Sequence, residues 1–363
     1  MTIKQLAYAA QQHIQSHTGT TLKRAHVYEL LAAAFGFGSY AALSAEWLFT
    51  QQPIAPRSPA AHHQEVGGRC LDLGYSAEAS VQISKSLPAL LISQEVGIVR
   101  LDTLIAILNR EYDEAGTDSE QLPDEADEDA LRHCHLLRDG LLSAAAKDSA
   151  RAHYALALVD RLSDDDYEAS PSSDYWFNQA RNGPALSAAQ QEFADSYAAE
   201  LKGRASVEHH LREAARLGHQ EALLLLAEEF GDDAFFEQAN LSATTVDPAR
   251  IAMIAEQLGR DADTKKWLTV AASKGDTDAM LQLIEEHDTE NLQQCWVWLY
   301  LAGLLGSDLT QGVAINERGG SYEDGDGAIY ALTGIELQPL SPEDDSAALQ
   351  RAERIFQSIR MKD

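Results

Sequence analysis

One stretch of small and large apolar residues at helical spacing constrains the fold of this chain more than any other feature. The segment KKWLTVAASKGDTDAMLQLIEEH, residues 265–287, places Trp267 and Ala271 four residues apart, so both lie on one helical face. Gly275 falls where that helix should end, because glycine adopts the left-handed conformation of a C-cap without steric cost. Ala279 belongs to a second helix that follows. The stretch therefore predicts two helices joined by a tight turn, with alanines where the helices approach closely.

The same pattern recurs along the chain, and each copy has its own turn residue. The turn residues are Asp148, Gly183, Gly218, Gly275 and Gly306. Successive turns lie 35, 35, 57 and 31 residues apart, and three of these spacings match the roughly 34 residues of a tetratricopeptide-type helix hairpin. The long interval contains an additional segment, and its second part, residues 251–258, predicts the first helix of the next repeat.

The recurring pattern Trp-Leu-x-x-Ala-Ala-x-x-Gly-x-x-x-Ala-x-x-x-Leu resembles the Sel1-like repeat family, a subclass of tetratricopeptide-like helical solenoids. The resemblance covers roughly residues 130–310; it is strongest at 265–287 and 205–231, and the copies at 141–158 and 175–195 are degenerate. The family's Gly-x-Gly segment between repeats is mostly absent here. The resemblance implies an all-α solenoid whose stacked hairpins form a concave face for binding peptides or domains. The positions with a structural role in the repeats are Trp176, Gly183, Ala214, Gly218, Trp267, Ala271, Gly275, Ala279, Trp298, Ala302 and Gly306.

Residues 1–50 predict a small, separate helical module. Thr20 or Thr21 can cap a helix that Gly36 ends, and Ser39 can cap a short helix after it. An amphipathic helix should precede both, because apolar residues recur on one of its faces. These residues are Ile3, Leu6, Ala10 and Ile14.

The segment KRAHVYELLAAAFGFGSYAAL within this module resembles a small bacterial helical module for which no function is firmly known. Lys23, Arg24, His26 and Glu29 carry the resemblance, and they form a possible functional surface. The alternative interpretation is that Lys23 and Arg24 are merely solvated and that His26 packs locally.

Composition divides the rest of the chain into further segments. Three prolines in QQPIAPRSPAAHHQEV indicate one linker. The acid-rich stretch EYDEAGTDSEQLPDEADED indicates a second linker. LDLGYSAEAS in the second helical unit echoes AAFGFGSYAA in the first module, which suggests two related units. We predict a Pro-rich linker at 51–66, a second helical unit at 67–112, an acidic linker at 113–130, the solenoid at 131–310 and a C-terminal part at 311–363.

The C-terminal part predicts a short β-hairpin followed by a capping helix. Apolar residues alternate at Ile329 and Ala331 before a turn at 333–334, and at Ile335 and Leu337 after it. The segment SPEDDSAALQRAERIFQSI then predicts a helix with a serine cap and proline at its first position, which seals the end of the solenoid.

The net charge of −29 is concentrated after the first part of the chain. Residues 1–110 hold 8 Lys and Arg against 7 Asp and Glu, so residues 111–363 hold 20 against 50, a net charge of −30. Nucleic-acid binding is therefore disfavoured, because its affinity comes mainly from neutralising phosphates. An acidic solenoid favours partners with basic or mixed basic–apolar segments. Solubility alone is the more common explanation of such a charge.

The cysteines and the hydropathy pattern favour a cytoplasmic protein without membrane association. Cys70, Cys134 and Cys295 are widely spaced and odd in number, which fits reduced, buried thiols better than disulfides. No apolar run approaches the ~20 residues of a membrane span, and the first residues lack the apolar core of a signal peptide.

No motif in the sequence assembles catalytic chemistry. The EDGDG segment lacks the alternating ligands and twelfth-position glutamate of a calcium loop. The histidine pairs in HHQ, HCH and EHHL lack partners at zinc-site spacings. We find no nucleophile elbow, phosphate loop or dinucleotide fingerprint. We therefore expect no enzymatic activity, no cofactor and no metal.

The sequence favours a protein–protein interaction scaffold or adaptor that uses the concave face of an acidic solenoid. Two alternatives remain open at this point. One is an acidic inhibitor or immunity-type protein that covers a basic site on a target. The other is a nucleic-acid-associated regulator that docks through residues 1–50.

Overall fold

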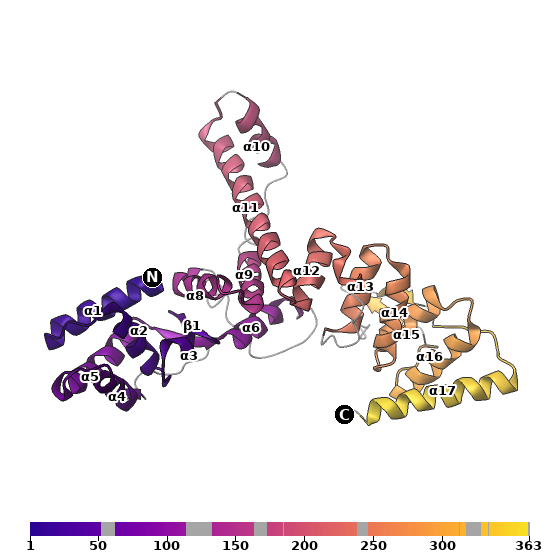
Figure 1. The fold of residues 1–363 in the computed structure, drawn as a ribbon. Coiled ribbons are helices and arrows are strands. Elements are labelled where there is room, and N and C mark those ends of the chain that lie inside the picture. Colours follow the sequence, from indigo (N-terminus) through magenta and orange to yellow (C-terminus); the bar gives the residue numbers. More distant parts are fainter. Residues whose placement is uncertain are drawn as a thin grey trace. The chain divides into compact units, whose positions relative to one another are not determined.

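The chain is mostly helical, as predicted. The computed structural model describes residues 1–51, 62–113, 133–162, 173–183, 185–237, 246–311, 313–316, 328–332 and 334–361. These residues divide into two compact units, Met1–Leu226 and Ala227–Asp363 (Figure 1). Within the described part of the chain, no helix has both the length and the apolar character needed to cross a membrane.

Unit 1 begins with two segments that have the same order of elements. Each has a helix, a glycine with positive φ, a serine-capped helix and a strand. The first segment contains α2 (Arg24–Ala33), α3 (Tyr40–Ser44) and β1 (Trp47–Thr50), and α1 (Ile3–Thr18) precedes it. The second segment contains α4 (His63–Asp72), α5 (Ala77–Ser93) and β2 (Gly97–Arg100).

The turn chemistry of the two segments matches closely. Gly36 follows α2 with φ 82° and Gly74 follows α4 with φ 87°, a conformation that glycine adopts without steric cost. The hydroxyl of Ser39 accepts a hydrogen bond from the Ala42 amide, and Ser76 caps α5 in the same way. The echo between the two sequence segments therefore corresponds to a structural similarity.

The prediction that residues 1–50 fold separately as a helical unit is wrong. Strand β1 pairs antiparallel with β2, with Trp47 opposite Arg100 and Thr50 opposite Gly97. Helix α1 packs on α5, and α2 packs on α4. The apolar face of α1 is buried, as predicted, but it is covered by the second segment. The two segments share one core because neither can bury its apolar faces alone.

Two boundaries also differ from the prediction. Helix α2 starts at Arg24 after Lys23, which makes no side-chain cap, so neither threonine caps it. Helix α4 starts at His63, inside the linker predicted at 51–66, and residues 52–61 lie outside the described part of the chain. The acidic linker predicted at 113–130 also lies outside it, apart from its first residue.

The rest of unit 1 is helical. It contains α6 (Leu101–Asp113), α8 (His135–Ala145), α9 (Ala150–Leu162), α10 (Ser173–Asn182), α11 (Ala188–Arg216) and the start of α12 (Gln220–Phe230). Asp148 lies in the turn between α8 and α9 with φ 59°, which fits its predicted role as a turn residue. Asp tolerates the left-handed region better than most residues with a Cβ.

Helix α11 merges two helices that the repeat pattern separates. Its 29 residues include the second helix of the predicted 175–195 copy and the first helix of the 205–231 copy. The joining sequence has no proline, and Gly203 costs a helix only about 1 kcal/mol relative to alanine. A single long helix therefore replaces the two helices that the pattern assigns to separate repeats.

Unit 2 is mainly helical, and its consecutive helices from residue 248 onward pack on each other. Gly259, Gly275 and Gly306 end helices with φ values of 67°, 105° and 95°. The elements are η2 (Asp233–Phe235), α13 (Pro248–Gln257), α14 (Asp261–Ala272), α15 (Thr277–Gln282), the π-helical turn η4 (Leu283–His287), α16 (Leu292–Leu305), β3 (Val313–Asn316), β4 (Ala328–Leu332) and α17 (Pro342–Arg360).

The C-terminal hairpin has a different partner strand from the one predicted. Strand β4 contains Ile329 and Ala331 as expected, but it pairs antiparallel with β3, which precedes it. Residues 335–337 form no strand, and the Ile335 amide donates instead to the carbonyl of Leu309 at 2.9 Å. The predicted turn therefore does not form a hairpin, and the EDGDG segment lies in the connection between the two strands, outside the described residues.

The capping helix α17 follows the prediction. The Ser341 hydroxyl accepts a hydrogen bond from the Asp344 amide, and Pro342 occupies the first helical position. Helix α17 packs on α16, which is the last helix of the predicted repeat region.

Substitution Ala271→Leu should destabilise unit 2, because Ala271 is buried where α14 packs on its neighbours. We expect the free energy of unfolding to fall by about 1–3 kcal/mol through overpacking. The matched control is Ala262→Leu, at an exposed position of the same helix. Urea titrations followed by circular dichroism measure both variants, and equal stability of the two would show that Ala271 does not face a close neighbour.

Candidate functional site

Three of the four residues that carry the N-terminal resemblance make contacts inside unit 1. His26 Nδ1 lies 2.8 Å from the hydroxyl of Tyr75, and the Lys23 amide donates to the same hydroxyl at 3.4 Å. The Arg69 guanidinium donates to the Glu29 carboxylate. These contacts hold α2 against α4 and the turn that follows it, whereas Arg24 is exposed. The alternative interpretation, that His26 packs locally, does not account for this contact. Tyr75 lies 49 residues away in the chain, in the segment LDLGYSAEAS.

The predicted repeat positions are mainly core and turn positions. Gly183 lies in the bend after α10, and Gly218 has φ 91° in the turn after α11. Trp176 is only half-buried on α10. The buried members are Ala214, Trp267, Ala271, Ala279, Trp298 and Ala302.

A buried carboxylate joins three elements of unit 2. Asp288 follows the π-helical turn η4 and is 5 % exposed. The Lys265 ammonium donates to its Oδ1 at 2.7 Å, and the Trp298 indole donates to its Oδ2 at 2.9 Å. The Cys295 thiol donates to the Asp288 carbonyl at 3.1 Å. A buried charge is tolerated only when it is paired and hydrogen-bonded, and Asp288 meets both conditions.

The polar role of Trp298 was not evident from the sequence. The repeat pattern identifies Trp298 only as a packing residue, but its indole N–H also satisfies a carboxylate ten residues earlier in the chain. A buried Trp usually needs such an acceptor. Acidic residues close in sequence to the repeat tryptophans are therefore the signal that would have identified this hydrogen bond.

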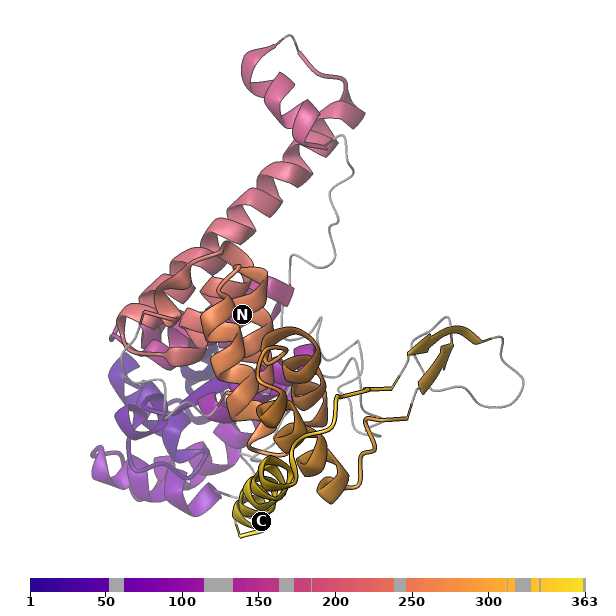
Figure 2. The same cartoon turned by 90° about the vertical axis from the view of Figure 1, so that its right-hand side faces the viewer.

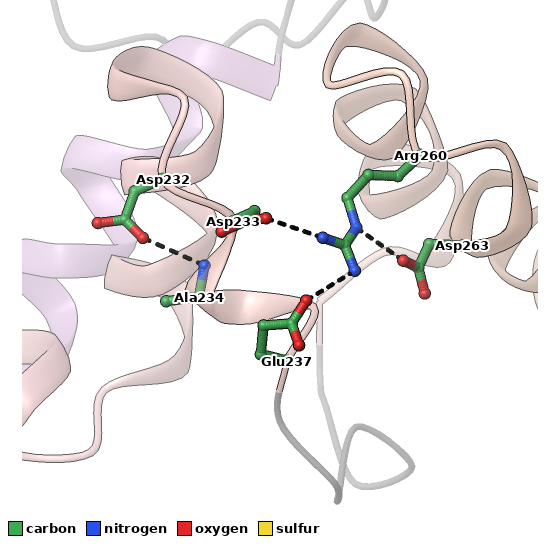
Figure 3. A network of polar contacts seen from close by, with 6 residues as sticks. All are labelled: Asp232, Asp233, Ala234, Glu237, Arg260 and Asp263. Atoms are coloured by element: carbon green, nitrogen blue, oxygen red, sulfur yellow. Dashed lines mark hydrogen bonds and ion pairs between the residues drawn. The ribbon is translucent and has the colours of Figure 1, made fainter.

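A second polar cluster in unit 2 is centred on Arg260, in the turn between α13 and α14 (Figure 3). Its guanidinium donates to Asp233 at 2.9 Å, to Glu237 at 3.0 Å and to Asp263 at 2.8 Å. It also lies over the ring of Phe236, 5.2 Å from the ring centroid. The hydrogen bond to Asp263 is the main cause that raises the pKa of Arg260. One cation thus holds residues 233–237 against the α13–α14 pair.

Exposed carboxylates remain on the neighbouring helices. Residues 227–363 hold 26 Asp and Glu against 10 Lys and Arg, and the two clusters above neutralise only some of the acids. Five exposed acids lie on α14, α15, η4 and the turn after η4, and these three elements pack on one another. We call these residues the acidic set: Asp261, Asp278, Glu285, Glu286 and Glu290.

Three histidines lie at or beside the contact between α9 and α11 in unit 1: His210 is buried, and His153 and His219 are half-buried. His153 Nδ1 and His210 Nδ1 lie 3.1 Å apart, and His219 stacks on Tyr154 with ring centroids 4.3 Å apart. Burial is the main cause that lowers the pKa of His210 to about 4, and the same cause lowers the pKa of His219 to about 4. Both imidazoles are therefore neutral at pH 7.

The carboxylate of Asp160, beside this contact, accepts hydrogen bonds from other side chains of the protein. Asp160 is 6 % exposed, and it accepts hydrogen bonds from Arg138 at 2.5 Å and from the Ser206 hydroxyl at 2.7 Å. In the part of the chain that the structure describes, no three His, Cys, Asp or Glu side chains are placed to share a metal ion. The α9–α11 contact is thus built as a packed, hydrogen-bonded seam.

The cysteines are buried and free, as predicted. Burial raises the pKa of the Cys70 thiol to about 11, and burial followed by the nearby Asp288 carboxylate raises the pKa of Cys295. Thiols held in the protonated form are poor nucleophiles.

Comparison with known proteins provides no relative. No family model, no curated protein and no solved structure matches the chain. The similarity to Sel1-like repeats therefore rests on the residue pattern alone, and function has to be argued from the geometry described above.

The histidine seam predicts that unit 1 loses stability in mild acid. The folded state keeps His210 and His219 neutral, whereas the unfolded chain binds protons near the ordinary pKa of 6.5. Their contribution is therefore fully present above pH ~6.5 and is lost as the pH falls toward ~4. We expect a loss of about 1–3 kcal/mol in the free energy of unfolding over that range and none between pH ~7 and ~8.

Denaturant titrations at several pH values test this expectation. Substitution His219→Phe keeps a ring against Tyr154 and removes one titrating group, so its loss in acid should be smaller than that of the native chain. Substitution His135→Gln, at an exposed position on α8, is the matched control and should leave the pH dependence unchanged. A native chain of constant stability from pH ~7 to ~4.5 would contradict the prediction.

Asp288→Ala should destabilise unit 2, because it leaves the Trp298 indole N–H buried without an acceptor and removes the partner of Lys265. We expect a loss of about 2–4 kcal/mol. Glu290→Ala, two residues away and exposed, is the control, with an expected change within about 0.5 kcal/mol. Thermal melting measures both, and similar melting temperatures would show that Asp288 does not hold the three elements together.

Proposed function

We propose that this chain is a non-enzymatic protein-binding scaffold, and that residues 131–310 are Sel1-like helix hairpins that stack as an α-solenoid. Three observations support the stacking. Consecutive helices of unit 2 pack on each other, small residues are buried between them, and positive-φ residues form their turns. Asp148 extends the same turn geometry to the α8–α9 pair of unit 1.

The observation that carries the proposed binding role is the acidic set. Arg260 and Lys265 pair with the shielded carboxylates of Asp263 and Asp288, whereas the acidic set is exposed on three packed elements and the turn after them. Exposed Lys266 on α14 and Lys274 in the turn after it are outnumbered by the acidic set. A surplus of one charge on a surface attracts the opposite charge and speeds encounter. The partner is therefore a protein with a basic or mixed basic–apolar segment.

A binding role is also favoured by the state of the titratable groups. The cysteine thiols are buried, with the pKa raised at Cys70 and Cys295, and the seam histidines are neutral and engaged in unit 1. Reduced, buried thiols fit the reducing cytoplasm, where we place the protein.

A second candidate function uses the same acidic set. An acidic inhibitor or immunity-type protein would cover a basic site on one target and block its activity stoichiometrically. The exposed carboxylates favour this possibility as much as they favour a scaffold, and activity of the captured partner distinguishes the two functions.

The nucleic-acid regulator receives less support. It requires a basic surface on residues 1–50, and the described structure engages Glu29, His26 and the Lys23 backbone in contacts between α2 and the second segment. Residues 1–50 contain only three Lys and Arg, too few for the 6–10 phosphate contacts of a typical site.

The proposal predicts a salt-sensitive association rate. A partner is first captured from an extract of the source cells at about 50 mM salt, and its rate constants are then measured at about 50, 150 and 300 mM. We expect the association rate to fall roughly tenfold across this series, because screening shortens the reach of the carboxylates. Neutralising the whole acidic set to Asn and Gln should slow association more than it speeds dissociation, since single exposed pairs contribute only about 0–1 kcal/mol.

The control variant neutralises five exposed acids of unit 1 and should keep the native association rate. These residues are Asp72, Glu78, Glu95, Asp148 and Asp174. A salt-independent association rate, or a partner that docks only on residues 1–110, would exclude the acidic set as the binding surface.

A further inference from the structure

Helices α10 and α11 form a hairpin that extends away from the other helices of unit 1 (Figures 1 and 2). Helix α11 is 29 residues long, or roughly 43 Å at 1.5 Å per residue. Its C-terminal half packs on α9 through buried residues such as Val207 and Leu211. Its N-terminal half packs on α10. The hairpin is therefore anchored at one end only.

The extended part of this hairpin has almost no core. Among the described side chains from residue 174 to residue 205, only Ala194 is buried. Tyr175 is 53 % exposed, Phe193 is 42 % exposed and Leu201 is 40 % exposed, and three further aromatic side chains are only half-buried. Those three are Trp176, Phe177 and Tyr197. Apolar side chains gathered in this way on a surface usually mark an interface.

The apolar residues of α11 form a stripe. Phe193, Tyr197 and Leu201 follow each other at intervals of four residues, so they lie on one side of the helix. The ring of Phe177 on α10 packs against Tyr197 with centroids 5.4 Å apart, which extends the stripe toward the second helix. Glu192 and Lys202 project from the opposite side of α11.

The net charge of the hairpin indicates which kind of partner can bind over this stripe. Residues 173–206 contain three Lys and Arg and four Asp and Glu, a net charge of −1 within a chain of net charge −29. A strongly basic partner gains little from so neutral a surface. Two copies of this chain, in contrast, can approach here without the repulsion that their acidic parts would impose.

We propose that the α10–α11 hairpins of two copies of this chain pack together as an antiparallel four-helix bundle. A two-fold axis near Tyr197 places Phe193 of one copy beside Leu201 of the other, and brings the two Tyr197 rings together. The stripe is thus complementary to itself, as an isologous dimer contact requires. Two-helix hairpins commonly complete their core in this way.

The size of the stripe sets the strength of the contact. A large apolar side chain has about 150–250 Å² of surface, so the exposed fractions of the stripe residues, Phe193, Tyr197, Leu201 and Phe177, leave on the order of 200 Å² per copy to be covered. With flanking residues, the interface falls in the lower part of the range for specific complexes, ~1,200 Å² in total. A dimer with a micromolar dissociation constant follows. This inference does not rest on the proposed binding role of the acidic set.

Sedimentation velocity on the full-length chain tests the dimer, over about 1–300 µM protein at ~150 mM salt. We expect a concentration-dependent dimer, and the double substitution Phe193→Asp with Leu201→Asp should weaken it at least tenfold. The matched control is Leu142→Asp with Met253→Asp, because these side chains are 45 % and 47 % exposed outside the hairpin. All four replaced side chains are already exposed, and circular dichroism verifies that the helices persist.

Disulfide trapping locates the axis. The three native thiols are buried, so Tyr197→Cys introduces an accessible thiol that should form a disulfide-linked dimer on mild oxidation. Met253→Cys is the control and should not cross-link. A chain that is monomeric at ~300 µM, or a dimer that the Phe193/Leu201 substitutions leave intact, would overturn the proposal. Salt separates this contact from the acidic set, since an apolar dimer should not weaken from ~50 to ~300 mM.

Discussion

Close packing between consecutive helices is the constraint on which most of this structure depends. Helices can approach closely only where side chains are small, and the chain can reverse direction between them only where a residue accepts a left-handed backbone. Ala271 and Ala302 meet the first requirement, and Gly275 and Asp148 meet the second. The larger repeat residues, such as Trp267, then fill the space beside the alanines.

The acidic residues of unit 2 fall into two groups: some are paired with Arg260 or Lys265, and others are exposed to solvent. Arg260 pairs with three carboxylates at one turn, and the half-exposed Lys265 pairs with the buried Asp288 of the same unit. The pairs that involve Asp263 and Asp288 gain strength from partial burial and hydrogen bonding, whereas the pairs with the exposed Asp233 and Glu237 contribute little. The remaining exposed acids outnumber the exposed lysines over α14, α15, η4 and the turns that join them, whereas the α10–α11 hairpin is nearly neutral. Two surfaces with different chemistry thus favour different kinds of contact.

Local features of this fold could be predicted from the sequence, and contacts between distant segments could not. Glycine turns and serine caps depend on a few neighbouring residues, so Gly218 and Ser341 were identified correctly. The strands at 47–50 and 97–100 are short apolar runs that periodicity cannot distinguish from helix, and each needs the other to form. The long helix α11 was missed because the repeat pattern assigns its two halves to separate hairpins, whereas Gly203 disfavours a continuous helix only weakly. The exposure of the acidic set and the bond between Trp298 and Asp288 depend on tertiary packing, which no local pattern specifies.

Because helix α11 is uninterrupted, its free N-terminal half and its packed C-terminal half can move only as one rigid rod. Because no turn separates the free arm from the anchored half, a force at the tip acts on the whole rod. The arm from Ala188 to Ala205 is roughly 27 Å long at 1.5 Å per residue. A sideways load there becomes a torque about the contact with α9, where Ser206 and His210 meet Asp160 and His153. The arm would therefore pivot at the α9–α11 contact, and the hydrogen bonds of this contact oppose bending of the arm relative to the rest of unit 1.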